Sequence, residues 1–100
     1  MIIYMSGPIS NTLDYKERFA DAKKKILKQF PDAEVINPTM VELPSTCSHK
    51  DYMNIDFKLL DLAETICMLP GWDCSKGACM EYGYAMAKDL NILELEQLFR

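Results

Sequence analysis

Short apolar runs alternate with segments of helical periodicity along the whole chain, and this alternation constrains the fold more than any other feature. The apolar runs predict strands at 2–5, 34–36, 65–69 and 90–95. The spacing of apolar residues predicts helices at 14–29, 51–63 and about 75–88. Strands that alternate with helices form a parallel sheet with both faces covered. The sequence therefore predicts a single α/β domain over residues 1–100.

Local signals set the ends of these elements. Asp14 and Glu17 resemble a capping box at the start of the first helix, and Pro31 ends that helix. Residues 39–50 contain Pro44 and many polar side chains, and we expect them to form a loop. The residues after the fourth strand are expected to begin a further helical turn.

Two loops of unusual composition follow the first and third strands, at 6–11 and 70–77. In parallel sheets, ligands bind beyond the carboxyl ends of the strands, where the strand order reverses. The two loops are therefore expected to frame a binding site.

Charge disfavours a nucleic-acid polymer as partner. The net charge is −4 and the pI about 4.9, whereas polymer binders neutralise phosphates with a basic face. The basic run formed by Lys23, Lys24, Lys25 and Lys28 is interpreted as a solvated helix face. No apolar stretch approaches the roughly 20 residues that span a bilayer, and a strand begins at Ile2 without a signal peptide. We expect a cytoplasmic protein with no membrane partner.

The four cysteines do not predict a metal site. Their spacing contains no C-x-x-C pair and no paired histidine, so zinc is not expected. Cys67 and Cys79 lie in apolar segments, where a reduced cysteine behaves as a small hydrophobic residue.

Asp56 falls inside the apolar arc of the second helix, beside Tyr52 and Ala63. An unpaired buried carboxylate is costly, so Asp56 is expected to have a partner, a raised pKa or a pocket. A structural role, in which it accepts hydrogen bonds from backbone amides, is the alternative. The arc is also wider than one sheet face can cover, which suggests contact with another subunit.

Glu81 is the only charged residue between Gly77 and Ala87. Periodicity places it at the edge of the apolar face, so an exposed glutamate and a functional one are both compatible with the pattern. Its position near the start of the third helix places it close to the ligand end of the sheet.

The start of the third helix is a candidate anion site. Ser75 is placed to cap this helix, and free backbone amides at Lys76 and Gly77, together with the helix dipole, favour an anion. Gly7 and Ser10 are expected to supply the facing wall. Trp72 is interpreted either as packing or as a plate on which a base stacks.

His49 is the only histidine. With Cys47 nearby, a Cys-His nucleophile pair is conceivable, but the surrounding Ser/Thr-rich loop offers it no ordered partner. The pair is therefore disfavoured.

Several motifs together resemble the nucleoside 2-deoxyribosyltransferase-like superfamily, and most closely its short branch, DUF4406. They are Tyr4-Met5-Ser6-Gly7-Pro8-Ile9, Asn37-Pro38, Met53-x-x-Asp56, Leu69-Pro70-Gly71-Trp72 and Ser75-x-Gly77-x-x-x-Glu81-x-Gly83-x-Ala85. The resemblance covers nearly the whole chain, and its last motif is the most specific.

The resemblance implies a Rossmann-like or flavodoxin-like three-layer sandwich with four to five parallel strands. It also implies a homo-oligomer, a dimer or larger, that completes its active sites across subunits. Glu81 matches the family's nucleophile, Asp56 a proton donor to the leaving base, and Tyr4 a tyrosine that holds the nucleophile. The expected ligand-binding residues are Gly7, Pro8, Ile9, Ser10, Trp72, Asp73, Ser75 and Gly77.

One position departs from the transferases of the superfamily, which have an aspartate six residues before the glutamate. This chain has Ser75 there. A serine resembles the nucleotide N-hydrolase branch, where it contacts a 5′-phosphate, and this favours a nucleoside monophosphate as ligand. Asp73 is a candidate substitute for the missing carboxylate.

These observations leave open more than one class of function. The first is an enzyme that cleaves an N-glycosidic bond, as a nucleoside or nucleotide N-glycosidase or a deoxyribosyltransferase, without a metal or cofactor. The second is a non-catalytic protein that senses or sequesters a nucleotide. A weaker third is a purely structural interaction protein.

Overall fold

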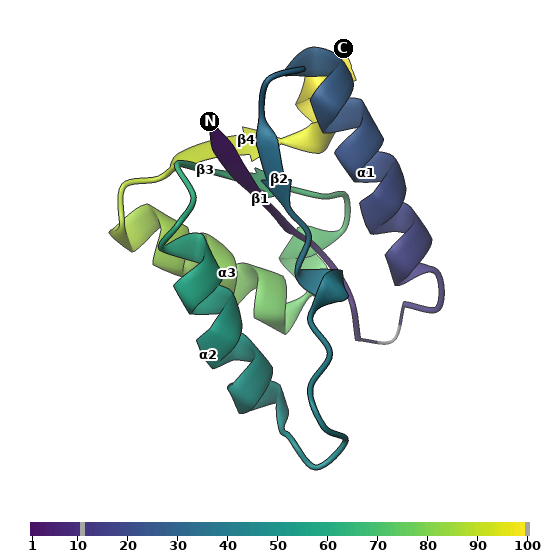
Figure 1. The fold of residues 1–100 in the computed structure, drawn as a ribbon, viewed down its shortest axis with the longest axis vertical. Helices are drawn as coiled ribbons and strands as arrows, with labels where there is room; N and C mark the ends of the chain where they lie inside the picture. Colours follow the sequence, from purple (N-terminus) through teal and green to yellow (C-terminus); the bar gives the residue numbers. More distant parts are fainter. Residues whose placement is uncertain (11, 100) are drawn as a thin grey trace.

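The computed structural model describes residues 1–10 and 12–99, and its core is a four-stranded, all-parallel sheet (Figure 1). The strands are β1 (Ile2–Ser6), β2 (Glu34–Ile36), β3 (Thr65–Met68) and β4 (Asn91–Glu94). The α-helices are α1 (Tyr15–Gln29), α2 (His49–Leu60) and α3 (Lys76–Ala87). Three short 3₁₀ helices are η1 (Pro38–Met40), η2 (Trp72–Cys74) and η3 (Leu95–Phe99). The parallel α/β prediction is confirmed. Asn11, part of the first predicted binding loop, lies outside the described residues.

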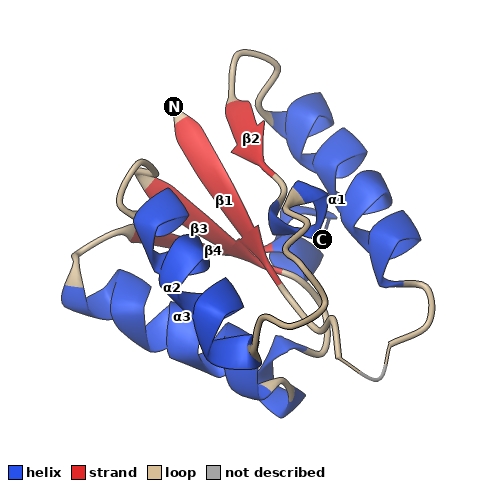
Figure 2. Cartoon of the chain, turned by 60° about the horizontal axis from the view of Figure 1, so that its bottom comes forward, coloured by secondary structure: helices blue, strands red, loops and turns tan. Residues whose placement is uncertain are grey.

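Helices cover both faces of the sheet: α1 lies on one face, and α2 and α3 lie on the other (Figure 2). Alternation along β1 explains the two layers, because successive side chains of a strand point to opposite faces. Ile3 and Met5 pack with Phe19 of α1, whereas Tyr4 packs with Leu60 of α2. The three-layer sandwich is therefore confirmed, with one hydrophobic core on each side of the sheet.

The strand order β2-β1-β3-β4 reverses direction at β1. The chain moves from β1 to β2 on one side and returns to place β3 on the other side. The loops that leave the carboxyl ends of β1 and β3 therefore run in opposite directions, which opens a crevice between them. This is the place at which sequence reasoning located the binding site.

The second helix begins earlier than its periodicity predicted. Ser48 accepts a hydrogen bond from the backbone of Asp51, and the Asp51 carboxylate accepts one from the backbone of Ser48, which forms a complete capping box. His49 is therefore the first helical residue, and the expectation of a loop through residue 50 was wrong. The helix also ends sooner, at Leu60.

The capping box expected at Asp14 is absent. Asp14 precedes α1 but makes no side-chain cap, and its carboxylate forms an ion pair with Arg18 at 3.0 Å instead. The expected further helical turn after the fourth strand is present as η3.

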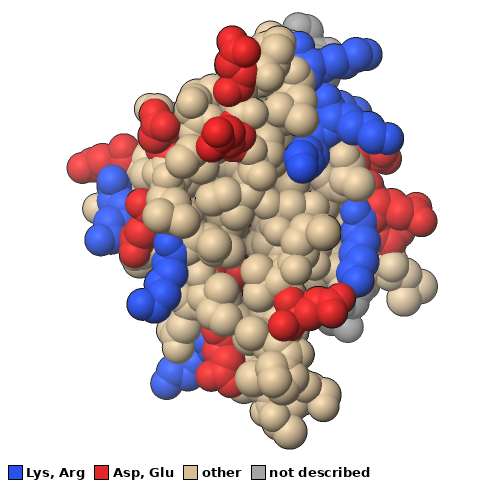
Figure 3. Space-filling view, in the orientation of Figure 1, with Lys and Arg blue, Asp and Glu red and all other residues tan. Residues whose placement is uncertain are grey.

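The basic run is a solvent-exposed helix face, as the sequence predicted. The four lysines of the basic run are exposed on α1, and Lys and Arg side chains gather over this helix at the right of Figure 3. Cys67 is buried in β3, whereas Cys79 is exposed on α3, although both lie in apolar segments of the sequence. All four cysteines are free.

Candidate active site

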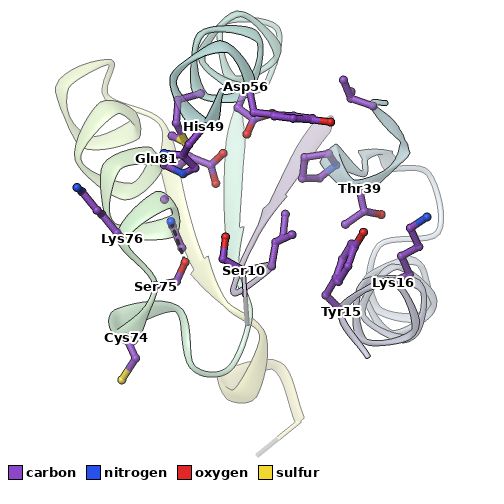
Figure 4. Close-up of a pocket in the computed structure, with 18 of the residues that line it drawn as sticks. Ser10, Tyr15, Lys16, Thr39, His49, Asp56, Cys74, Ser75, Lys76 and Glu81 are labelled. Carbon is purple, nitrogen blue, oxygen red and sulfur yellow. Dashed lines mark hydrogen bonds between the residues drawn. The ribbon is translucent and has the colours of Figure 1, made fainter. Parts of the chain in front are cut away.

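A cavity of about 730 Å³ lies at the carboxyl end of the sheet, within the range typical of small-molecule sites. One wall carries His49 and Asp56 of α2 together with Ser75, Lys76 and Glu81 at and after the start of α3 (Figure 4). Tyr15, Lys16 and Thr39 lie on the opposite side, and Ser10 lies between the two. The cavity therefore joins segments that are distant in the sequence.

Glu81 is only 5% exposed and lies against β1. Tyr4 and Ser6, two residues apart on one face of that strand, both donate hydrogen bonds to its carboxylate. The Tyr4 hydroxyl lies 2.6 Å from Oε2 and the Ser6 hydroxyl 2.6 Å from Oε1. Each carboxylate oxygen is therefore held by one donor from the sheet.

Asp56 is 8% exposed and lines the same cavity as Glu81, near enough for each carboxyl group to influence the pKa of the other. Tyr4 is also within reach of the Asp56 carboxyl group. Of the three alternatives expected for a buried Asp56, which were a partner, a raised pKa or a pocket, the structure shows the pocket, because Asp56 lines the cavity. The groups that influence its carboxyl group are side chains of the site.

The pKa of Glu81 is raised to about 8, mainly because the carboxyl group is buried; hydrogen bonds from Ser6 and Tyr4 lower the pKa, and the neighbouring Asp56 carboxyl group raises it. Burial also raises the pKa of Asp56, while its neighbours Glu81, Tyr4 and His49 lower it. The pKa of Tyr4 is raised, mainly by burial and then by the two carboxyl groups. Burial of the two carboxyl groups therefore favours a pair that holds a proton near neutral pH.

The start of α3 borders the cavity. Ser75 caps the helix, because its hydroxyl accepts a hydrogen bond from the backbone of Ala78 at 3.3 Å. Gly77 lies one turn before Glu81, and a Cβ atom there would be 3.3 Å from Nε2 of His49 and 3.5 Å from the Met53 sulfur. A side chain at Gly77 would therefore crowd the wall of the cavity.

The turn after β1 contributes Gly7, Ile9 and Ser10 to the cavity. A Cβ atom on Gly7 would lie 2.9 Å from Cβ of Leu69, a contact that real side chains do not make. Glycine is required here because the turn passes directly against the segment that follows β3.

Pro8, Trp72 and Asp73 do not line the cavity, although sequence reasoning grouped them with the ligand-binding residues. Trp72 stacks on Tyr82 with ring centroids 4.7 Å apart, and its indole donates a hydrogen bond to Glu94. Trp72 and Asp73 line a separate pocket of about 220 Å³. For Trp72 the structure therefore supports the packing interpretation.

Sequence reasoning missed His49 as a member of the cavity wall. His49, Met53 and Asp56 occupy one face of α2 at helical spacing, and all three line the cavity. The signal was the capping box that begins at Ser48, which places residue 49 inside the helix. Cys47 does not line the cavity, so the disfavoured Cys-His pair has no support.

Within residues 1–10 and 12–99, no group of three or more His, Cys, Asp or Glu side chains is arranged to hold a metal ion. None of the helices in the same part of the chain is long and apolar enough to cross a bilayer.

A family model for a domain of unknown function, DUF4406, matches residues 1–94. The chain belongs to the DUF4406 family. No curated protein matches it in sequence.

A solved structure has a similar fold. The DUF4406 chain is similar to the 2-desoxiribosyltransferase from Leishmania mexicana, with a TM-score of 0.67 and 21% sequence identity. The match covers 93% of the DUF4406 chain and 62% of the other protein, so the chain spans somewhat under two thirds of the longer one. The two proteins therefore share the parallel α/β fold.

Proposed function

We propose that this DUF4406 protein binds a nucleoside or nucleoside 5′-monophosphate and cleaves its N-glycosidic bond, as an N-glycosidase or a 2-deoxyribosyltransferase. One observation carries the proposal: Glu81, held by Tyr4 and Ser6, lies in the cavity beside a second buried carboxyl group, Asp56. The fold shared with a 2-desoxiribosyltransferase supports it.

The reaction has two steps. In the first, Asp56 gives its proton to a nitrogen of the leaving base as the bond from C1′ to that base breaks. A carboxylate oxygen of Glu81 forms a bond to C1′ and captures the oxocarbenium-like centre. In the second, water or the nitrogen of another base attacks C1′, Glu81 leaves, and the proton lost by the attacking group returns to Asp56. Atoms and charge balance in both steps.

Binding involves the residues around this pair. Ser10, Ser75 and Gly77 line the cavity near the start of α3 and are proposed to receive the 5′ end of the ligand. A serine that replaces a carboxylate at position 75 removes a negative charge that would repel a phosphate. This favours a monophosphate.

The test is an assay for free base. The protein is incubated with a panel of ribo- and deoxyribonucleosides and their 5′-monophosphates, and the products are separated by chromatography. Wild type is expected to release base from at least one of them, and Glu81→Ala from none. Glu17→Gln, an exposed change on α1, is the matched control and should behave as wild type. Absence of base from the whole panel, with a folded protein, contradicts the proposal.

A second candidate is a protein that binds the same ligands without turnover. The raised pKa of Glu81 favours it, because a protonated carboxyl group is not a nucleophile. Calorimetry that shows tight binding, with the ligand recovered intact and binding unchanged in Glu81→Gln, would support this alternative.

A further inference from the structure

An aromatic surface for the base must come from a residue other than Trp72, which stacks on Tyr82 and lines a separate pocket. Two tyrosines line the cavity itself, Tyr15 at the start of α1 and Tyr52 on α2. A flat ring at the wall of a binding site is the kind of surface on which a base stacks.

Tyr52 is the tyrosine that lies on the same side of the cavity as the reacting pair. It precedes Asp56 by four residues, so the two side chains share one face of α2. Tyr15 lies across the cavity from Asp56 and Glu81 (Figure 4). An acid must lie within hydrogen-bond reach of the nitrogen that it protonates, so the base has to lie against Asp56. This requirement favours Tyr52 as the neighbour of the base.

The ring of Tyr52 is held at both ends. Its backbone belongs to α2, and its hydroxyl oxygen accepts a hydrogen bond from the backbone N–H of Leu43 at 3.1 Å. The side chain is half-buried, and it still lines the cavity. A ring that is fixed before binding loses little conformational entropy when a base stacks on it.

The same hydrogen bond anchors one end of the segment 39–43, at Leu43. At the other end, the side-chain oxygen of Asn37 accepts a hydrogen bond from the backbone N–H of Thr39 at 3.0 Å and one from the Thr39 hydroxyl at 2.6 Å. Three residues of this segment line the cavity: Thr39, Val41 and Glu42. The anchored segment therefore forms an edge of the cavity beside Tyr52.

We propose that the ring of Tyr52 is the surface on which the base of the ligand stacks, with the segment 39–43 at the edge of that base. The inference rests on the proposed function, because the position of the base follows from the role given to Asp56. Stacking on an aromatic ring accepts any base, since every base has a flat π face. Tyr52 therefore adds affinity for bases in general, and a sugar phosphate without a base gains nothing from it.

The first test measures binding by calorimetry in a Glu81→Gln background, in which the ligand stays intact. The probes are the 5′-monophosphates of adenosine, cytidine and their 2′-deoxy forms, together with ribose 5-phosphate, which has no base. Tyr52→Leu should weaken binding of the nucleotides by about 5- to 150-fold and should leave binding of ribose 5-phosphate within about twofold. Tyr52→Phe keeps the ring and should lose much less affinity than Tyr52→Leu.

Two further variants complete the comparison. Tyr84→Phe, whose hydroxyl bonds to Asp61 outside the cavity, is the control and should bind the nucleotides as the background does. Tyr15→Leu removes the ring from the opposite wall, and a loss of nucleotide binding there but not in Tyr52→Leu would overturn the proposal. Equal losses in Tyr52→Phe and Tyr52→Leu would also overturn it, as would a loss in Tyr52→Leu that is the same for ribose 5-phosphate.

The second test needs no Tyr52→Leu protein. A base stacked on Tyr52 shifts the NMR signals of its ring protons upfield, and the signals are assigned by comparison with Tyr52→Phe. Saturation with the nucleotides should produce this shift in the Glu81→Gln background, and ribose 5-phosphate should not. Nucleotide binding without the shift would refute the role of Tyr52.

Both tests measure binding, so they separate this inference from the proposed function. The expected losses and shift in a protein that never releases base would support the base site while the proposed cleavage failed. Base release by a protein in which Tyr52→Leu binds nucleotides normally would refute the base site alone. Absence of binding by every nucleotide would contradict both.

Discussion

At the scale of the residue, two effects with opposite sign set the pKa of Glu81. Burial disfavours its charged form, whereas the hydroxyl groups of Tyr4 and Ser6 stabilise that form. The first effect is larger, and the pKa rises to about 8. The Glu81 carboxyl group therefore holds its proton more firmly than an exposed glutamate does.

Removing one of the two donors should weaken the nucleophile. Tyr4→Phe deletes the hydrogen bond to Oε2 of Glu81, and the loss of a bond to a charged group predicts a fall in kcat of about ten- to hundredfold. Tyr84→Phe is the matched control, because its hydroxyl bonds to Asp61 on the outer surface. Wild-type kcat in Tyr4→Phe would contradict the role assigned to this tyrosine.

Glu81→Gln should stabilise the fold at alkaline pH. The pKa of Glu81 is raised from its ordinary 4.5 to about 8, so its contribution to stability is complete below about 4.5 and is lost as pH rises through 8. Glutamine cannot ionise, so the variant does not lose this contribution to stability as pH rises. The free energy of unfolding of Glu81→Gln should equal that of wild type near pH 4.5 and exceed it by on the order of 3 kcal/mol above pH 8.

Urea unfolding at several pH values measures this difference. Glu17→Gln serves as the control, since it should show no growing difference from wild type. A Glu81→Gln variant that is less stable than wild type at pH 8.5 would show that the ionised carboxylate is stabilised in the fold.

At the scale of the element, the starts of α2 and α3 do most to shape the site. Both helices begin at the carboxyl end of the sheet, and each has a serine cap. The position of a residue along each helix then decides how far its side chain lies from the helix start and how deep it lies in the cavity. His49 and Gly77 lie near the helix starts, while Asp56 and Glu81 lie one or two turns further in.

The cap of α3 can be separated from ligand binding. Ser75→Ala removes the hydrogen bond to the backbone of Ala78 and should cost about 1 kcal/mol of unfolding free energy. Ser75→Asp keeps a capping oxygen, so its stability should stay close to wild type. Its negative charge should raise KM for a monophosphate more than KM for the matching nucleoside. Equal effects on the two substrates would show that no phosphate binds at Ser75.

Two glycines of α3 form a natural comparison. Alanine is favoured over glycine in a helix by up to about 1 kcal/mol, and a Cβ atom on Gly83 meets nothing within 4 Å. Gly83→Ala should therefore stabilise the protein by roughly that amount. Gly77→Ala should gain less, because its Cβ would crowd His49, and it should also alter base release. Equal gains in thermal unfolding would argue against a tight contact between His49 and Gly77.

At the scale of the whole molecule, α3 exposes apolar side chains on its outer surface. Met80 and Met86 are exposed on α3, close to Gly83, and the outer surface of this helix is largely uncharged. Association of copies of the chain stays a prediction. The sequence placed the contact at the apolar arc of the second helix, and the exposed methionines of α3 are a second surface at which to seek it. Light scattering measures the number of subunits.

The rate at which each cysteine thiol reacts should distinguish the exposed cysteines from the buried one. Cys74 and Cys79 are exposed and should react at once with a thiol reagent. Burial between the sheet and α1 raises the pKa of Cys67 to about 12, so Cys67 should react only when the protein unfolds. Mass spectrometry of native and urea-treated protein counts the modified thiols. Modification of Cys67 as fast as Cys74 would contradict the packing described here.

The sequence by itself determined the parallel sheet, the two helical layers and the burial of Asp56. Periodicity carries this information, because it fixes which side chains share a face of one element. Tertiary structure alone decided the rest. Glu81 belongs to a helix that is apolar on almost every side, so no pattern could select its face, and it is buried because that face meets Tyr4 and Ser6 of β1. The proximity of His49 to Gly77 and the distance of Trp72 from the cavity likewise depend on how separate elements pack, which no spacing within a single element records.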